Sequence, residues 1–228
     1  MSPQNVASSV DRGSPATAAR PAAWTRPIPA PVVVETPRLI LRPWTHADAG
    51  QLLEAIEDGR ASLLPWLPWA ATDNRTIAEC HYTIERFARD FAASGGSAYT
   101  SLVLGIFEKG TGRALGGTGF HDLKPGIHEC EIGYWVRASA RRRGICREAV
   151  EGWLTCLLSP QGGGAKPPGW GLRRVRIVCA ATNTASQGVP RSLNLRQEAR
   201  FRLDRYIEGH GWDDTLSFGV TAEEWAAR

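Results

Sequence analysis

The stretch that decides the fold is Glu131–Val150, with the sequence EIGYWVRASARRRGICREAV. It combines an apolar strand pattern, a short loop with three arginines and one glycine, and the start of a helical pattern. The first amide groups of a helix have no partner inside it, and the helix dipole adds partial positive charge at that end. The stretch therefore predicts an anion site, with a phosphate-bearing ligand at residues 141–147.

Length and composition fit ordinary soluble proteins. The chain has 228 residues, of which 43% are hydrophobic and 22% are charged. No apolar run approaches the roughly 18 residues that a membrane-spanning helix needs, and the start lacks the pattern of a signal peptide. The five cysteines form no CxxC pair, so we expect free thiols, a cytoplasmic protein and no bound metal.

The chain divides into a tail and one domain. Residues 1–30 are rich in Ala, Pro and Ser, which predicts a disordered tail. The single domain follows from residue 31 to residue 228, and it shows no internal repeat.

The domain alternates strand and helix patterns. Strand patterns occur at 32–34, 39–41, 99–107, 115–123, 129–136, 174–181, 201–207 and 215–220. Helical patterns occur at 45–58, 77–91 and 145–158, and Gly59 is expected to stop the first. Short turns between strands predict antiparallel pairing, whereas the strand–helix–strand order from 129 to 181 predicts a parallel pair. We therefore expect an α/β domain with a mixed sheet.

Two further segments have unusual proline content. In SLLPWLPWA (62–70) the prolines exclude a regular helix or a central strand. Its Trp66 and Trp69 fit either the aromatic wall of a ligand pocket or a hydrophobic lid on the core. Farther on, Asn183–Leu195 begins like a helix, and Pro190 should kink or shorten it.

In their order and spacing, these motifs resemble the GCN5-related N-acetyltransferase (GNAT) superfamily, in particular its ribosomal-protein acetyltransferase (RimJ/RimL-like) branch. The resemblance covers nearly all of the chain after residue 30 and rests on ETPRLILRPW, WLPW, EIGYWVR, the arginine-rich loop, the Asn183–Ser186 motif and GHGWDDTLSFGV. It implies the GNAT fold, with a mostly antiparallel sheet of about seven strands and helices on both faces. It also implies a splay between the strands at 131–136 and 174–181.

The same resemblance implies acetyl-coenzyme A as co-substrate, bound in this splay. A glycine lets the backbone approach phosphate closely, and arginines add charge. A solvated basic loop is the alternative interpretation. The expected coenzyme contacts are Tyr134, Trp135, Val136, Arg141, Arg142, Arg143, Gly144, Ile145, Cys146 and Asn183.

The implied reaction transfers acetyl directly to a primary amine, which must lose a proton. Glu131 is the candidate base, although a salt-bridged strand carboxylate is as plausible, and Ser186 is the candidate proton donor to the departing thiolate. Strand parity puts Tyr134 on the opposite face from Glu131 unless a bulge at Gly133 intervenes. His121 is a candidate substrate-side residue together with Trp66 and Trp69, although a lone histidine is more often structural.

The branch implies a protein N-terminal α-amine as acceptor and a homodimer. The alternative acceptor is a small amine, such as an aminoglycoside or an amino-acid analogue. A polycation would need acidic groups, for which Glu54, Glu57, Asp58 and Asp213-Asp214 are the visible candidates. A disrupted Pro190 segment would instead leave a non-catalytic acyl-coenzyme A binder. Nucleic acid is not an expected partner, because the arginines form one local cluster.

Overall fold

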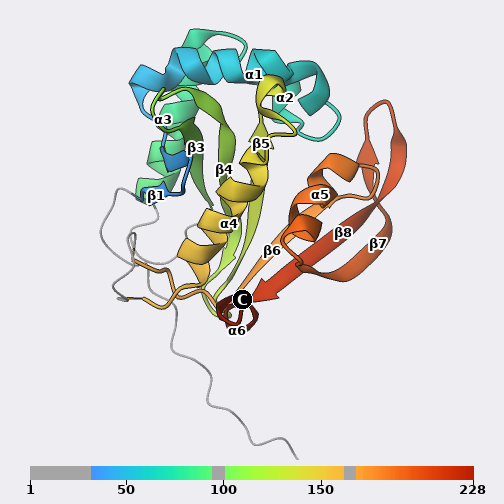
Figure 1. Ribbon diagram of the computed structural model, residues 1–228. Helices are drawn as coiled ribbons and strands as arrows, with labels where there is room; N and C mark the ends of the chain where they lie inside the picture. Colours follow the sequence, from blue (N-terminus) through green and yellow to red (C-terminus); the bar gives the residue numbers. More distant parts are fainter. Residues whose placement is uncertain (1–31, 94–100, 162–167) are drawn as a thin grey trace, which may run out of the picture.

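The computed structural model describes residues 32–93, 101–161 and 168–228 (Figure 1). Within these residues, eight strands form one sheet in the order β1-β2-β3-β4-β5-β6-β8-β7. The predicted α/β fold with a mixed, mostly antiparallel sheet is confirmed, with eight strands where about seven were expected. The expected tail at 1–30 lies outside the described residues.

Strand bounds agree with the sequence patterns to within a few residues, except at β7, which begins five residues early. The strands are β1 (Val34–Glu35), β2 (Leu39–Pro43), β3 (Ser101–Glu108), β4 (Ala114–Lys124), β5 (Glu129–Val136), β6 (Arg174–Ala180), β7 (Arg196–Ile207) and β8 (Gly211–Thr221).

Helices cover both faces of the sheet, as expected. They are α1 (Ala49–Leu63), α2 (Trp69–Thr72), α3 (Ile77–Ala93), α4 (Ile145–Leu158), α5 (Thr184–Ser192) and α6 (Ala222–Ala226), with 3-10 turns η1 (His46–Asp48) and η2 (Ala138–Ala140). Among the described residues, no helix is long and apolar enough to cross a membrane.

Two hydrophobic clusters hold the helices to the sheet. On one face, α4 buries Ala149, Trp153 and Leu157 against strands β2 to β6. Trp153 stacks on Phe120 of β4, with ring centroids 6.3 Å apart. On the other face, α1 and α3 pack on a smaller cluster around Trp44 and Phe107. Each helix therefore buries the apolar stripe that its sequence period predicted.

Helix α1 is longer than predicted, so the stop at Gly59 is wrong. The helix continues to Leu63, and Gly59 faces the segment after β5. A β-carbon at Gly59 would lie 3.4 Å from the backbone nitrogen of Ala138. A side chain at this position would make only ordinary contacts, so Gly59 is an interior helix residue and does not end the helix.

The parallel pair in the middle of the sheet opens partway along its length. β5 and β6 pair only from Glu129–Arg174 to Glu131–Arg176. Beyond that point, residues 132–136 pair with β4 alone and residues 177–180 pair with β8 alone. Figure 1 shows β6 and β8 leaning away from β5 toward the top of the view. The expected splay is confirmed, and it leaves one edge of β5 free for a ligand.

Candidate active site

The loop before α4 presents a row of free backbone amides. Gly144 is the N-cap of α4 with φ of 75°, and Arg142 also has a positive φ of 59°. Among the described residues, the amides of residues 142–147 donate to no other group of the chain. Consecutive free amides at a helix start form an anion cradle. This geometry fits a pyrophosphate.

Side chains of the turn between β1 and β2 hold this loop in place. Glu148 of α4 accepts hydrogen bonds from the Thr36 hydroxyl (2.6 Å) and from Arg38 Nε (2.6 Å). Arg38 also donates from Nη1 to the carbonyl of Arg143 (3.1 Å). Burial raises the pKa of Glu148, but these hydrogen bonds outweigh burial and leave the pKa below its ordinary value. The loop is therefore anchored before any ligand arrives.

The arginine side chains of the loop do not converge on one point. Arg143 pairs with Glu108 of β3 (3.3 Å). Arg141 lies against α1, where a β-carbon at Gly59 would be 3.6 Å from its Nη2. Arg142 is exposed. The backbone rather than a cluster of guanidinium groups therefore forms the cradle.

The two faces of β5 have separate tasks. Tyr134 and Val136 pack toward α4, whereas Trp135 packs toward the α1 and α3 side. The register at Gly133 is regular, and the irregularity in this strand pair lies between His121 and Lys124. The suggested bulge at Gly133 is wrong, and the parity argument that separates Tyr134 from Glu131 holds. The ring of Trp135 lies on the α1 and α3 side of the sheet. Only the backbone of Trp135 can therefore contact a ligand on the α4 side.

Tyr134 compensates for the proline in α5. Pro190 has no amide hydrogen, so it cannot donate to the carbonyl of Ser186 four residues earlier. The Tyr134 hydroxyl donates to that carbonyl instead (2.8 Å). Burial raises the pKa of Tyr134, so the phenol keeps its proton. Helix α5 accordingly runs through Pro190 and ends at Ser192, which confirms a shortened helix.

The other coenzyme-side residues are also placed by α5 and α4. Asn183 caps α5, where its side-chain oxygen accepts from the amide of Ser186 (3.0 Å). The Ser186 hydroxyl lies 3.4 Å from that of Tyr134. Ile145 is buried in the core, so its amide is the part that faces the loop. Burial raises the pKa of the Cys146 thiol to about 12, so this residue acts as an apolar wall.

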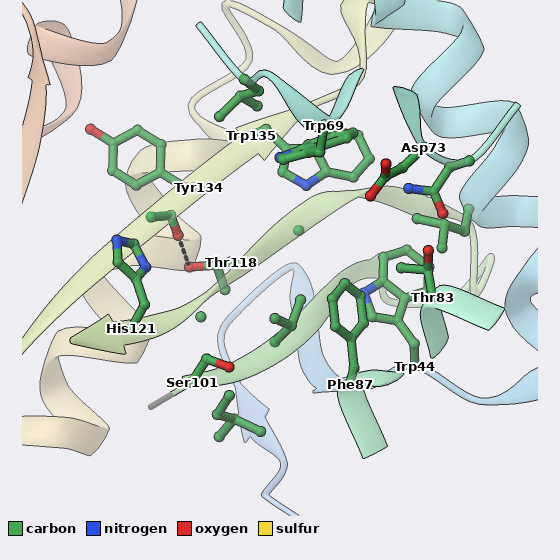
Figure 2. Close-up of a pocket in the computed structure, with 18 of the residues that line it drawn as sticks. Trp44, Trp69, Asp73, Thr83, Phe87, Ser101, Thr118, His121, Tyr134 and Trp135 are labelled. Carbon is green, nitrogen blue, oxygen red and sulfur yellow. Dashed lines mark hydrogen bonds between the residues drawn. The ribbon is translucent and has the colours of Figure 1, made fainter. Parts of the chain in front are cut away.

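A cavity of about 290 Å³ lies on the opposite face of β5, under α1 and α3 (Figure 2). Its walls are mostly aromatic, and Trp69 contacts Trp135 with ring centroids 5.8 Å apart. Its floor is backbone, because Gly117, Gly119 and Gly133 have no side chains there. The cavity thus opens directly onto the splayed part of β5. The aromatic side chains on this face are Trp44, Trp69, Phe87 and Trp135, whereas the rings of Phe120 and Tyr134, which also border the cavity, pack on the α4 side.

His121 lies at one end of this cavity and is oriented by Glu131. Its Nε2 is 3.0 Å from Glu131 Oε1. Since a carboxylate only accepts, Nε2 carries the hydrogen and Nδ1 is left as an acceptor. A β-carbon at Gly133 would lie 3.9 Å from this Nδ1. The free nitrogen therefore faces the strand at which the coenzyme edge opens.

Glu131 itself is further from the cavity than its histidine partner. Its second oxygen pairs with Arg176 of β6 (3.2 Å), and Arg176 also pairs with Asp122 of β4. Glu131 lines a second hollow of about 640 Å³ over β6, β7 and β8, together with Arg174 and Arg205. Glu131 thus belongs to the second hollow, and it touches the first cavity only through its contact with His121.

Of the two tryptophans in the WLPW segment, only Trp69 lines the cavity. The ring of Trp66 packs on His210 in the β7–β8 turn, with centroids 5.7 Å apart. This contact bridges the two halves of the splayed sheet. Within this segment, Trp69 therefore forms part of the cavity wall, whereas Trp66 links the segment to the β7–β8 turn.

The acidic residues considered for a polycation are engaged elsewhere. Glu54 and Asp58 pair with the buried Arg137 (2.7 and 2.8 Å), and Glu57 pairs with Arg60 (2.7 Å). Asp213 and Asp214 accept hydrogen bonds within the β6–β8 region. None of the five lines the cavity.

Sequence reasoning missed the polar end of the cavity. Asp73, Asn74 and Thr83 line it together with Arg86, and Arg176 was missed as the partner of Glu131. Asp-Asn before a helix start reads as an ordinary turn, so no local signal separated it from other turns. The basic alternation Arg174, Arg176 was the one available signal for the groove. The five cysteines are free, as expected.

Comparison with known proteins identifies the family. Residues 38–196 match the model of the acetyltransferase (GNAT) domain. The chain is 24% identical over 178 residues to YdaF of Bacillus subtilis (strain 168), whose name assigns it to the ribosomal N-acetyltransferases, covering 78% of this chain and 88% of YdaF.

Solved structures agree in fold. RimL, a ribosomal L7/L12 alpha-N-protein acetyltransferase in complex with coenzyme A, superimposes with a TM-score of 0.69 at 19% identity, covering 83% of this chain and 97% of that chain. The microcin C7 self-immunity acetyltransferase MccE, in complex with acetyl-CoA and AMP, gives 0.67 at 18% identity, covering 82% and 93%.

The family match spans well over half of the chain, and the relatives' names agree with the ribosomal-protein branch that the motifs indicated. The splay of the sheet lies where the resemblance implied it, between β5 and β6. The chain belongs to the GNAT family of acetyltransferases.

Proposed function

We propose that this enzyme transfers acetyl from acetyl-coenzyme A to the α-amine of a protein N-terminus, in the cytoplasm. The observation that carries the proposal is the open edge of β5 beyond Glu131. That edge has the amide cradle at its end on one face and the aromatic cavity on the other. A thioester arriving along the edge would meet an amine held in the cavity.

In this proposal, backbone groups and helix ends bind the coenzyme. Amides of residues 142–147 would hold the pyrophosphate. The free edge at residues 132–136 would pair with the pantetheine arm, since its backbone groups have no strand partner on that side. Acetyl-coenzyme A supplies the activated acetyl group. Ser186 and Tyr134 hold protons beside the same edge, which suits protonation of the leaving thiolate.

His121 is the base in this proposal. Its Nδ1 is free and faces Gly133, whereas both oxygens of Glu131 are already engaged by His121 and Arg176. Glu131, the base expected from the sequence, is then a positioning residue that fixes the tautomer of His121. The pair takes the proton from the attacking amine.

The size of the cavity favours one residue of a peptide as the inserted group. About 290 Å³ is at the small end for a ligand pocket. The polar hollow over β6 and β8 begins at Glu131, the partner of His121, and in this proposal it takes the residues that follow. Names of the relatives support a ribosomal-protein N-terminus, and the homodimer expected for this branch stays a prediction.

A small amine is the second candidate, because a cavity of about 290 Å³ is large enough to hold one alone. A polycation is disfavoured, since the acidic residues near the site are paired within the chain. A non-catalytic binder is disfavoured as well, because α5 keeps its cap and passes through Pro190 intact.

The test is acetylation of ribosomal N-terminal peptides with free and with blocked α-amines, followed by mass spectrometry. Transfer to free amines alone is expected. His121→Asn should lower kcat by about 100-fold or more without changing coenzyme affinity, whereas Glu131→Gln should shift the pH–rate profile. His46→Asn is the matched control, because this exposed histidine lies outside both hollows. Full activity in His121→Asn would disprove the assignment of the base.

A further inference from the structure

The cavity has a polar end opposite His121. Figure 2 shows Asp73 and Thr83 on the far side of the aromatic rings from His121. Asn74 lines the same cavity and follows Asp73 in the turn between α2 and α3. A ligand with its amine at His121 would therefore direct its other end toward these three side chains.

Among these three residues, Asn74 has the side chain with an unsatisfied hydrogen-bonding atom. It is 4% exposed, and its Oδ1 is buried with no hydrogen-bond partner among the described residues. A buried polar atom left without a partner costs about 1–3 kcal/mol. Such groups are few in native structures, and a functional role, an ordered water or an ion accounts for them.

The turn that holds Asn74 is rigid. Asn74 has a φ of 58°, a conformation that asparagine tolerates better than most residues. Arg60 of α1 donates to the carbonyls of Ala70 (2.5 Å), Asp73 (3.3 Å) and Asn74 (2.5 Å). Because the guanidinium bonds these three carbonyls, the backbone of the turn is fixed and keeps Asn74 among the residues that line the cavity.

Charges at this end are nearly balanced. One oxygen of Asp73 accepts from the Thr72 hydroxyl (2.7 Å), and the other lies 3.5 Å from Arg86. Thr83 adds a buried hydroxyl. A cation would gain little from a carboxylate that is already paired, whereas a neutral donor could bond the Asn74 oxygen. The end therefore suits a hydroxyl or a carboxamide.

We propose that Asp73, Asn74 and Thr83 form a recognition subsite for a neutral hydrogen-bond donor on the acceptor. The preferred acceptor then has an amine at one end, an apolar body between the aromatic walls, and a hydroxyl or carboxamide at the far end. This inference rests on the proposed function and specifies the first residue of the acceptor.

The test uses peptides that differ only in a near-isosteric first residue: Tyr or Phe, Thr or Val, and Asn or Leu. For at least one pair, kcat/KM should favour the donor-bearing member by about tenfold or more, the value of one buried hydrogen bond. Asn74→Gly removes the amide without backbone strain, because glycine adopts positive φ freely. It should bring that ratio close to one, because kcat/KM falls more for the donor-bearing member than for the apolar member.

Asn194→Gly is the matched control, because Asn194 also has a positive φ (49°) but is exposed and outside the cavity. It should leave the ratio unchanged. A wild-type ratio near one for all three pairs would overturn the subsite, and so would a ratio that survives in Asn74→Gly.

If no peptide is acetylated, the proposed function is wrong. Binding of free amines then tests separately whether the subsite recognises a hydrogen-bond donor. Calorimetry with tyramine and phenethylamine should then show tighter binding of tyramine to the wild type and equal binding to Asn74→Gly. Equal binding of both amines to the wild type would overturn the subsite.

Discussion

The proposed coenzyme side of β5 consists of backbone groups, whereas the proposed acceptor side consists of side chains. On the proposed coenzyme side, the site consists of backbone amides at Gly144 and the following residues. On the proposed acceptor side, it consists of aromatic rings and the Asn74 side chain. Both sides use a residue with positive φ, 75° at Gly144 and 58° at Asn74. One presents donors to an anion, and the other presents an acceptor to a donor.

The difference teaches how a site becomes visible in a sequence. A backbone site constrains φ and leaves a glycine where few other residues fit. A site made of side chains from α1, α3, β3 and β4 leaves no local pattern, because each residue is ordinary within its own element. The two sides should therefore respond separately to mutation.

Gly144→Val should give the largest effect on the coenzyme side. Valine at a φ of 75° costs about 1–2 kcal/mol, and relief of that strain would displace the amides. Coenzyme affinity should fall by about tenfold or more, measured by calorimetry, while the acceptor preference persists.

Gly110→Val is its matched control. Gly110 has a φ of 83° in the β3–β4 turn and no atom near its added β-carbon. It should lose similar stability and keep its coenzyme affinity. Equal coenzyme binding by both variants would contradict the amide cradle.

Tyr134→Phe should have the next largest effect. It leaves the Ser186 carbonyl without its donor and should lower the free energy of unfolding by about 1–2 kcal/mol. Pro190→Ala in the same chain restores an amide donor and should recover most of that loss, which a double-mutant cycle by urea unfolding measures.

Tyr82→Phe is the control, because this tyrosine on α3 is largely exposed. It should be close to neutral. Additive losses for Tyr134→Phe and Pro190→Ala would show that the tyrosine does not replace the missing amide.

Glu148→Gln should have the smallest effect, and one that depends on pH. The folded state lowers the pKa of Glu148 below 4.5, so its stabilisation is present above that pH and is lost as the pH falls through the folded value. The variant should be less stable than wild type by about 1 kcal/mol at pH 7, and the difference should shrink toward pH 3.

Glu151→Gln removes an exposed pair with Arg147 in the same helix. Its cost should stay below about 0.5 kcal/mol. A Glu148→Gln difference that stays constant with pH would contradict the role of the carboxylate in anchoring the loop. The turn at Asn74 is held by bonds from Arg60 to backbone carbonyls, which do not titrate, so acceptor preference should not follow this pH dependence.

Much of the fold could be predicted because its signals are local. Strand runs, the helix after Gly144 and the parallel pairing around it follow from period and connection order. Gly59 was misread because a glycine that ends a helix and one inside a helix look alike in sequence. Pro190 could not be judged alone, since its missing donor is replaced by Tyr134, 56 positions away in the printed sequence.

The sequence by itself determined the order of the elements, the family and the anion-binding loop, because propensity and φ constraints act between neighbours in the chain. Tertiary structure alone decided which end of the cavity is polar and which residue presents a free base. His121, Glu131 and Arg176 meet only where β4, β5 and β6 are paired. Likewise, Asn74 lacks a partner only because α1 and α3 bury it. Contacts of this kind depend on packing between distant segments, which no local pattern records.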